Sequence, residues 1–145
     1  MAAPYTVFVY GTLKRGYPNA HVGMLRAAFC YEARTVERYP LVVGGKWFIP
    51  NLINEPGQGH QVRGEVYQVD DTVLAELDAL ETVHLPTGYR RVEIQIEPIE
   101  APGTGTAPIT AWTYLRERHH VGDIHAGPME TYPLDAGYVP VAKRG

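Results

Sequence analysis

Residues 5–13 read Tyr-Thr-Val-Phe-Val-Tyr-Gly-Thr-Leu, and this stretch decides how the chain begins to fold. The first six residues are β-branched or aromatic throughout, which predicts a buried strand. Gly11 ends this strand, and a glycine there can adopt a positive φ and approach a ligand closely. The loop that follows could hold an anion on successive backbone N–H groups, although an ordinary glycine at a strand end is the alternative. The phosphate-binding pattern GxxxxGK[ST] is absent.

Beyond this stretch, strand patterns outnumber helical ones. We expect strands at residues 30–36, 41–43, 61–69, 91–99 and 109–115, a well-marked helix at 73–82 after an N-cap, and a short helix at 20–28. Most of these strands lack the crossover helices that a doubly wound parallel sheet requires. The sequence therefore predicts an α+β fold, with a largely antiparallel sheet or small barrel and one or two packed helices. The tail from about residue 118 is expected to lack long regular structure.

The composition indicates a single domain over residues 1–145. Hydrophobic residues make up 45% of the chain, which is enough for a core and argues against disorder. The net charge of −3 disfavours broad nucleic-acid binding. The single cysteine, Cys30, excludes an intramolecular disulfide framework, and its apolar and aromatic neighbours predict core packing. No run approaches the roughly 18 apolar residues of a membrane span, and no signal peptide pattern is present, so we expect a soluble, cytoplasmic protein.

Glu81 is the chemically unusual residue of the predicted helix. At about 100° per residue it shares the edge of an apolar stripe formed by Val73, Leu74, Leu77 and Leu80. Burial and the negative end of the helix dipole both raise the pKa of a carboxyl in that place, which suits proton exchange near neutral pH. The alternative is a frayed helix end, where Glu81 points to solvent or pairs with Arg90 or Arg91.

The remaining polar candidates give weaker signals. His119, His120 and His125 have no carboxylate or cysteine partner at a recognised spacing, so a solvated loop is favoured over a metal site. Lys14 and Arg15 indicate a solvated rim. A nucleophile elbow of the GxSxG type is absent, so a hydrolase of that class has no support.

Residues 7–16, Val-Phe-Val-Tyr-Gly-Thr-Leu-Lys-Arg-Gly, resemble the opening signature of the γ-glutamylcyclotransferase superfamily, most closely its γ-glutamylamine cyclotransferase and AIG2-like branch. The resemblance continues in order through residues 39–42, 49–50, 64–70, 77–81, 89–91 and the strand that contains Tyr114. It covers roughly residues 5–115 and weakens in the tail. It implies a small mixed, mostly antiparallel β-barrel with one or two flanking helices.

The resemblance also implies an activity that needs no cofactor and no metal. The α-amine of a γ-glutamyl compound attacks its own γ-amide carbonyl, which yields 5-oxoproline and a free amine. Glu81 matches the general acid/base of the family, and the backbone amides of residues 11–13 match the loop that holds the α-carboxylate. The implied substrate-binding residues are Tyr10, Gly11, Thr12, Leu13, Tyr89, Arg91 and Tyr114.

Two alternatives stand beside this hypothesis. The first is a non-catalytic binding or interaction module that keeps the γ-glutamyl pocket, and the second is an enzyme that removes a γ-glutamyl group from a biosynthetic intermediate. In each case the expected partner is a small γ-glutamyl molecule, with no nucleic acid and no membrane. The oligomeric state and the identity of the leaving amine are not predicted.

Overall fold

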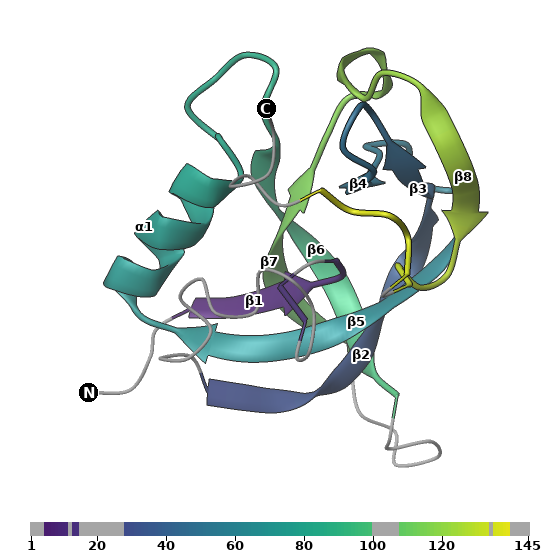
Figure 1. Cartoon of the computed structure of the whole chain (residues 1–145). Coiled ribbons are helices and arrows are strands. Elements are labelled where there is room, and N and C mark those ends of the chain that lie inside the picture. The colour runs from purple at the N-terminus through teal and green to yellow at the C-terminus, as the bar shows by residue number, and fades with distance from the viewer. Residues whose placement is uncertain (1–4, 12, 15–27, 100–107, 134, 140–145) are drawn as a thin grey trace.

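The computed structural model describes residues 5–11, 13–14, 28–99, 108–133 and 135–139. A closed barrel of five strands forms its centre, in the order β1 (Tyr5–Val9), β5 (His60–Val69), β2 (Ala28–Tyr39), β6 (Arg90–Pro98) and β7 (Ile109–Leu115) (Figure 1). Neighbouring strands are antiparallel except β1 and β7, which close the barrel as a parallel pair. The predicted α+β fold with a mixed, mostly antiparallel barrel is therefore confirmed.

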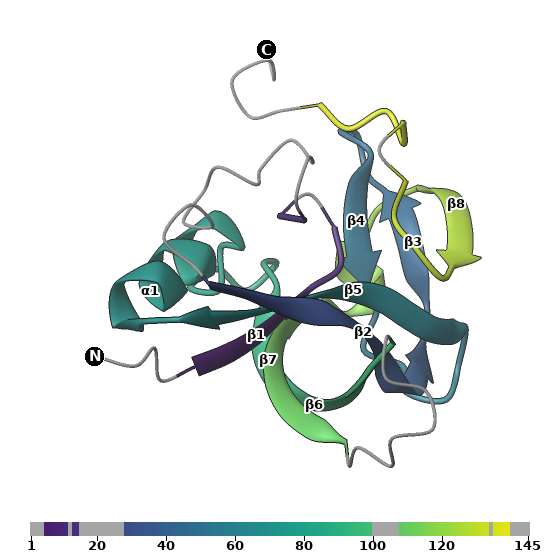
Figure 2. The same cartoon turned by 90° about the horizontal axis from the view of Figure 1, so that it is seen from below.

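The second half of strand β1, residues 7–9, is apolar because it separates two cores. Phe8 points into the barrel, where it packs with residues from all the other barrel strands, such as Val66 and Ile94. Val7 and Val9 belong to a second cluster, between the barrel wall and the helix. A strand that is buried on both faces has no polar face, so its sequence shows a continuous apolar run. The end-on view of the barrel in Figure 2 shows β1 within the wall.

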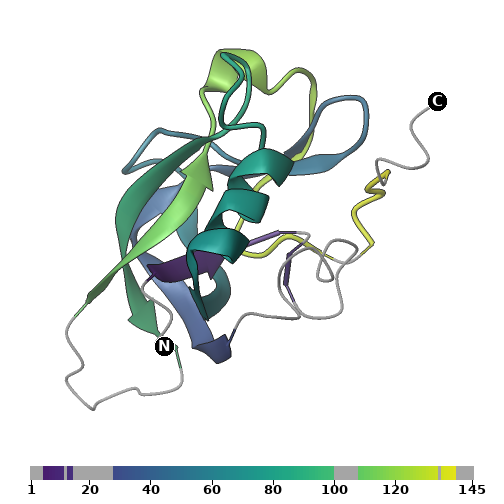
Figure 3. The ribbon, with the colours of Figure 1, turned by 90° about the vertical axis from the view of Figure 1, so that its left-hand side faces the viewer.

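Helix α1 (Asp71–Leu80) packs on the outside of this wall, as Figure 3 shows. Its N-cap is Asp70, whose carboxylate accepts a hydrogen bond of 2.9 Å from the Val73 backbone N–H. The buried face contributes Val73, Leu74 and Leu77 to the second core cluster. The helix ends at Leu80, so that Glu81 is its C-cap, at the edge of the barrel.

A second sheet lies beside the barrel. It has the order β4 (Ile49–Leu52), β3 (Leu41–Gly44) and β8 (Ile124–Met129), and all pairs are antiparallel (Figure 1). The expectation of an irregular tail is wrong here, because the tail forms β8 and a 3₁₀ turn at Arg118–His120. Most residues of β8 are exposed, so the strand depends on backbone pairing with β3 and leaves no alternating apolar pattern in the sequence.

Two other expectations are wrong. Cys30 is exposed rather than packed in the core, since it lies at a register shift of β2 between Phe29 and Tyr31. Lys14 is buried rather than part of a solvated rim. Its side-chain amine donates a hydrogen bond of 3.2 Å to the Tyr132 carbonyl oxygen, and burial lowers the pKa of this amine.

Several expectations concern residues outside the described part of the chain. These are Thr12, Arg15 and the helix at residues 20–28 except Ala28. Ala28 is the first residue of β2. Within the described residues, no helix combines the length and apolar character that a membrane crossing requires.

Candidate active site

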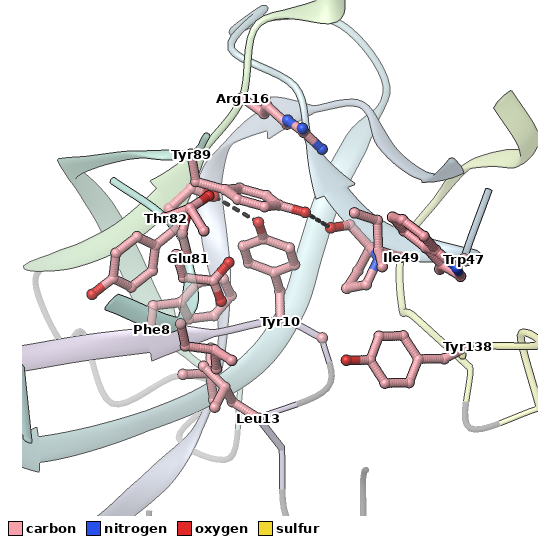
Figure 4. A pocket seen from close by; sticks show the side chains of 15 residues that line it. Phe8, Tyr10, Leu13, Trp47, Ile49, Glu81, Thr82, Tyr89, Arg116 and Tyr138 are labelled. Atoms are coloured by element: carbon pink, nitrogen blue, oxygen red, sulfur yellow. Dashed lines mark hydrogen bonds between the residues drawn. The ribbon is translucent and has the colours of Figure 1, made fainter. Parts of the chain in front are cut away.

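A cavity of about 230 Å³ opens where the end of β1, the turn after α1 and the start of β4 meet (Figure 4). The predicted residues Tyr10, Gly11, Leu13, Glu81, Tyr89 and Tyr114 all line it. The other lining residues were not predicted as site residues from the sequence; they are Phe8, Val9, Trp47, Ile49, Pro50, Leu80, Thr82, Arg116 and Tyr138. Segments far apart in the sequence therefore contribute to one concave site.

The backbone around Glu81 is tightly held. Its N–H donates to the Leu77 carbonyl at 2.9 Å, which completes the last turn of α1. Its own carbonyl accepts hydrogen bonds from the Tyr89 N–H at 3.1 Å and from the Thr82 hydroxyl at 2.7 Å. Thr82 has a positive φ of 51°, so the chain turns sharply directly after Glu81. The carboxyl of Glu81 consequently lines the cavity and does not fray into solvent.

The carboxyl of Glu81 titrates in an unusual range. Burial raises its pKa from 4.5 to about 7, and the Arg116 guanidinium opposes part of this rise. Pairing with the neighbouring arginines is not observed, since Arg91 contacts Asp78 and Arg90 donates to the Val83 carbonyl. A carboxyl with this pKa can accept and release a proton near neutral pH.

The raised pKa of Glu81 predicts a specific pH dependence of stability. Between pH 4.5 and about 7 the folded chain keeps this proton and the unfolded chain loses it, so the free energy of unfolding falls as pH rises. A glutamine cannot ionise, so the free energy of unfolding of Glu81→Gln does not fall in this way. Above pH 7 the variant should therefore be more stable than the parent, by about 3 kcal/mol at most. Urea unfolding of both chains at pH 4, 6 and 8 measures the difference, and an equal difference at all three pH values would contradict the assignment.

Three tyrosines form much of the cavity wall, and the hydroxyl of each donates a hydrogen bond to another group of the protein. Tyr10 donates to the Tyr114 carbonyl at 2.6 Å, Tyr89 to the Pro50 carbonyl at 2.5 Å, and Tyr114 to the Asp78 carboxylate at 2.8 Å. Burial raises the pKa of all three hydroxyls, so they stay neutral. Their oxygens keep lone pairs that can accept a hydrogen bond from a cationic donor in the cavity.

The loop after β1 forms the other side of the cavity. The Gly11 carbonyl accepts a hydrogen bond of 3.1 Å from the Lys14 N–H, which closes a turn. Gly11 does not have a positive φ, so the left-handed conformation that a glycine allows is not used here. The glycine is needed for close approach instead, because a Cβ there would lie 2.5 Å from Cγ of Pro50 on β4.

Arg116 follows β7 directly and is held on two sides. Its Nε donates to the Thr87 carbonyl at 3.0 Å, and its Nη1 donates to Oδ1 of the fully buried Asn51 at 3.1 Å. The guanidinium also lies 5.1 Å from the centre of the Tyr89 ring. The sequence feature that could have indicated Arg116 is its position as a cationic residue directly after the strand predicted at residues 109–115.

A comparison with models of protein families shows which family this chain belongs to. Residues 7–133 match the family described as gamma-glutamyl cyclotransferase, AIG2-like. The chain belongs to this family. The match includes the loop after β1, the turn at Glu81 and the strand that ends at Arg116.

Known proteins of the AIG2-like family are similar to this chain in sequence and in structure. A gamma-glutamylaminecyclotransferase from Bos taurus is 49% identical over 130 residues, which cover 87% of this chain and 74% of the bovine one. Its counterpart from Homo sapiens is 46% identical over 110 residues, or 70% of this chain and 69% of the human one. The crystal structure of an AIG2-like protein from Mus musculus superposes with a TM-score of 0.69 at 35% identity, and the match covers 93% of this chain and 88% of the mouse chain.

Arg91 is the one described candidate of this AIG2-like chain that does not line the cavity. Its Nε lies 2.9 Å from the Asp78 carboxylate, and its guanidinium lies 4.6 Å from the centre of the Trp112 ring. The Nε–H has no aligned hydrogen-bond acceptor among the described residues, so the Asp78 contact is mainly electrostatic. Since Asp78 also accepts from Tyr114, Arg91 supports the cavity wall from behind.

The histidines of the tail lie apart from this cavity. The rings of His119 and His120 contact each other at 4.0 Å, and His125 stacks on Phe48 at 4.1 Å. The described part of this AIG2-like chain contains no group of three or more histidine, cysteine or carboxylate side chains arranged to hold a metal ion.

Proposed function

We propose that this chain converts a γ-glutamylamine, or a related γ-glutamyl conjugate, into 5-oxoproline and a free amine. Family membership and the gamma-glutamylaminecyclotransferase relatives support this reaction. The observation that carries the proposal is the Glu81 carboxyl, which lines the cavity with a pKa of about 7. The substrate partner is then a small molecule, and the single cysteine favours a reducing, cytoplasmic compartment.

In this reaction the backbone amides of residues 11–13 hold the α-carboxylate of the glutamyl group, with Tyr10 beside them. Ionised Glu81 takes a proton from the α-ammonium, and the neutral amine attacks the γ-carbonyl carbon to close a five-membered ring. When the C–N bond to the leaving amine breaks, Glu81 gives this proton to the leaving nitrogen; the carboxylate then takes the second proton from the ring nitrogen and passes it to the released amine, so that the products are the neutral lactam and an ammonium ion. The attack is intramolecular, so the positioning of the two reacting atoms supplies much of the acceleration.

The buried tyrosines suit the ammonium end of this substrate. The hydroxyls of Tyr10 and Tyr89 already donate to backbone carbonyls, so each can only accept further hydrogen bonds. An ammonium group beside Glu81 supplies the matching donors. Tyr114 supports the wall through Asp78, and Arg91 supports the same carboxylate.

We also infer that residues 1–145 act as one domain. The largest core cluster contains residues of the barrel and of the second sheet together, such as Phe8 and Leu41, and it extends to Tyr132 in the tail. A shared core argues that these parts fold as one cooperative unit. The tail therefore belongs to the catalytic unit in this proposal.

The experiment that tests the function measures 5-oxoproline and free amine from a panel of γ-glutamyl alkylamines, γ-glutamyl dipeptides and the ε-linked γ-glutamyl lysine. The α-glutamyl isomers serve as controls, because their free amine cannot reach the scissile carbonyl in a five-membered ring. We expect equal amounts of both products from at least one γ-glutamyl conjugate and none from the controls. Thermal stabilisation by the panel without any turnover would contradict the proposal and favour a binding module.

A further inference from the structure

A fully buried amide lies behind the cavity wall. Asn51 is on β4, between Pro50 and Leu52, and it does not line the cavity itself. Apolar side chains ordinarily fill such a position, because an amide that leaves water costs free energy unless its polar atoms are hydrogen-bonded. The side chain of Asn51 therefore acts on the site through the groups that it binds.

The amide of Asn51 is hydrogen-bonded through both of its polar atoms. Its Nδ2 donates to the Ile49 carbonyl at 3.0 Å, which fixes the orientation of the amide. Its Oδ1 accepts from Nη1 of Arg116 at 3.1 Å and lies 3.2 Å from the Tyr89 hydroxyl. The hydroxyl hydrogen of Tyr89 has a nearer acceptor, the Pro50 carbonyl at 2.5 Å. Arg116 is therefore the partner that depends most on Asn51.

The bond to Asn51 fixes the far end of the Arg116 guanidinium. At the near end, Nε donates to the Thr87 carbonyl at 3.0 Å. The two bonds together hold the group over the Tyr89 ring, whose centre is 5.1 Å away. Without an acceptor at residue 51, Nη1 would be an unpaired donor, so the half-buried guanidinium would turn toward water.

Arg116 supplies the only positive charge among the described residues that line the cavity, which it shares with Glu81 (Figure 4). The other ionisable lining residues are Tyr10, Tyr89, Tyr114 and Tyr138. Burial raises the pKa of the first three hydroxyls, so these groups add no charge near neutral pH. Behind the wall, Asp78 and Arg91 offset each other as an ion pair. The position of Arg116 thus decides how strongly a cation acts on Glu81, whose pKa burial raises and Arg116 lowers.

Outside the cavity, Arg116 also acts on His120 of the 3₁₀ turn. Desolvation, His119 and Arg116 together lower the pKa of the His120 imidazole from 6.5. This ring is therefore mainly neutral above pH 6.5. It does not replace Arg116 as a source of positive charge in the range where Glu81 titrates.

We propose that Asn51 is a positioning residue of this site: its side-chain oxygen holds the Arg116 guanidinium at the cavity, where the positive charge favours the ionised form of the Glu81 carboxyl. The ionised form is the base that takes the proton from the α-ammonium, so this inference rests on the proposed function. Asn51 acts through Arg116 and is not a catalytic residue. The second sheet thereby contributes to the reaction from behind the cavity wall.

The first measurement needs no substrate. Titration of the Glu81 carboxyl by ¹³C NMR in the free chain gives its ionised fraction, and Glu81→Gln identifies the resonance. The side chain of Asn51→Leu is similar in size and cannot accept a hydrogen bond. In this variant we expect the ratio of ionised to protonated Glu81 at pH 7 to fall by about three- to tenfold.

The second measurement is the pH profile of kcat/KM for a γ-glutamylamine. Because the ionised carboxyl is the base, displacement of the Arg116 charge lowers activity more at low pH than at high pH. The loss in Asn51→Leu at pH 6 should exceed the loss at pH 9 by about three- to tenfold. A merely structural role would lower kcat/KM by the same factor at every pH.

A double-mutant cycle assigns the effect to Arg116. The single variant Arg116→Gln should also lower the ionised fraction of Glu81 at pH 7. The double variant Asn51→Leu/Arg116→Gln should show no further decrease, because Asn51 then has no guanidinium to hold. A second decrease of equal size in the double variant would overturn the route through Arg116.

Asn54→Leu is the matched control. Asn54 is exposed, and its side chain donates to Glu117. Its backbone N–H donates to the Arg116 carbonyl at 3.0 Å, a bond that the substitution leaves in place. This variant should keep the parent titration of Glu81. Asn51→Ala is a second test variant, because it removes the same acceptor without a branched side chain beside Gly44; it should show the same decrease as Asn51→Leu.

The outcomes separate this inference from the function on which it rests. An unchanged titration of Glu81 in a folded Asn51→Leu or Asn51→Ala chain would overturn the role of Asn51 and leave the cyclotransferase activity standing. If circular dichroism and thermal unfolding show that neither variant folds, Asn51 belongs to the scaffold and the positioning role is overturned as well. Absence of 5-oxoproline from every conjugate, with the NMR change present, would instead overturn the proposed function.

Discussion

Glu81→Gln is expected to lower kcat/KM for 5-oxoproline release by about 10²–10⁴-fold, the usual contribution of a general acid/base. The substitution keeps the size of the side chain and removes the group that takes up the proton. The helix end should persist, because it is held by backbone hydrogen bonds of residue 81 to Leu77 and Tyr89. The measurement is initial-rate kinetics with a γ-glutamylamine, beside circular dichroism of both chains.

The matched control for this substitution is Glu93→Gln. Glu93 is an exposed glutamate of β6 and does not line the cavity. Its variant should keep the parent rate within about twofold, since surface substitutions of this kind have small effects. If Glu81→Gln retained the parent rate, Glu81 would not be the proton carrier.

Gly11→Ala is expected to cause the second largest loss. The new Cβ would lie 2.5 Å from Cγ of Pro50, so the loop or β4 must move. Overpacking of this kind costs about 1–3 kcal/mol of stability. A displacement near 1 Å in a substrate-holding loop lowers the rate by up to about 10²-fold. Steady-state kinetics and thermal unfolding measure the two losses, and we expect KM to rise more than kcat falls.

The double variant Gly11→Ala/Pro50→Ala tests the cause of this loss. Removal of the proline ring eliminates the 2.5 Å contact and leaves the contact of 3.0 Å with Cβ of residue 50, so partial recovery of KM is expected. The carbonyl of residue 50 stays in place to accept from Tyr89. If the losses of activity caused by the two single substitutions simply added in the double variant, the contact between residues 11 and 50 would not be the cause of the Gly11→Ala effect.

Of the site residues, Glu81 could be recognised from its local pattern, whereas Tyr10, Leu13, Tyr89 and Tyr114 were indicated by the family resemblance. Glu81 stands out because a carboxylate at the edge of an apolar helical stripe is costly, and the structure places it in the cavity with a raised pKa. The strand at residues 5–10 and the helix after Asp70 were predictable because their residue patterns and the N-cap follow from local backbone geometry.

The features that the sequence did not reveal depend on contacts between distant segments. Arg116 enters the cavity because Asn51 and Thr87 hold it, and neither is near it in the sequence. Lys14 is buried through Tyr132, more than a hundred residues away. Strand β8 forms by backbone pairing with β3 and buries few side chains, so no apolar periodicity marks it.

The pH dependence of kcat/KM tests most directly whether the buried carboxyl of Glu81 is the base of a cyclotransferase. Since the ionised form must accept the proton, kcat/KM of the parent chain for a γ-glutamylamine should rise with pH and level off above an apparent pKa of about 7. The residual rate of Glu81→Gln should lack this limb. A parent profile that is flat from pH 5 to 8, or that levels off near 4.5 as for an ordinary glutamate, would contradict the account.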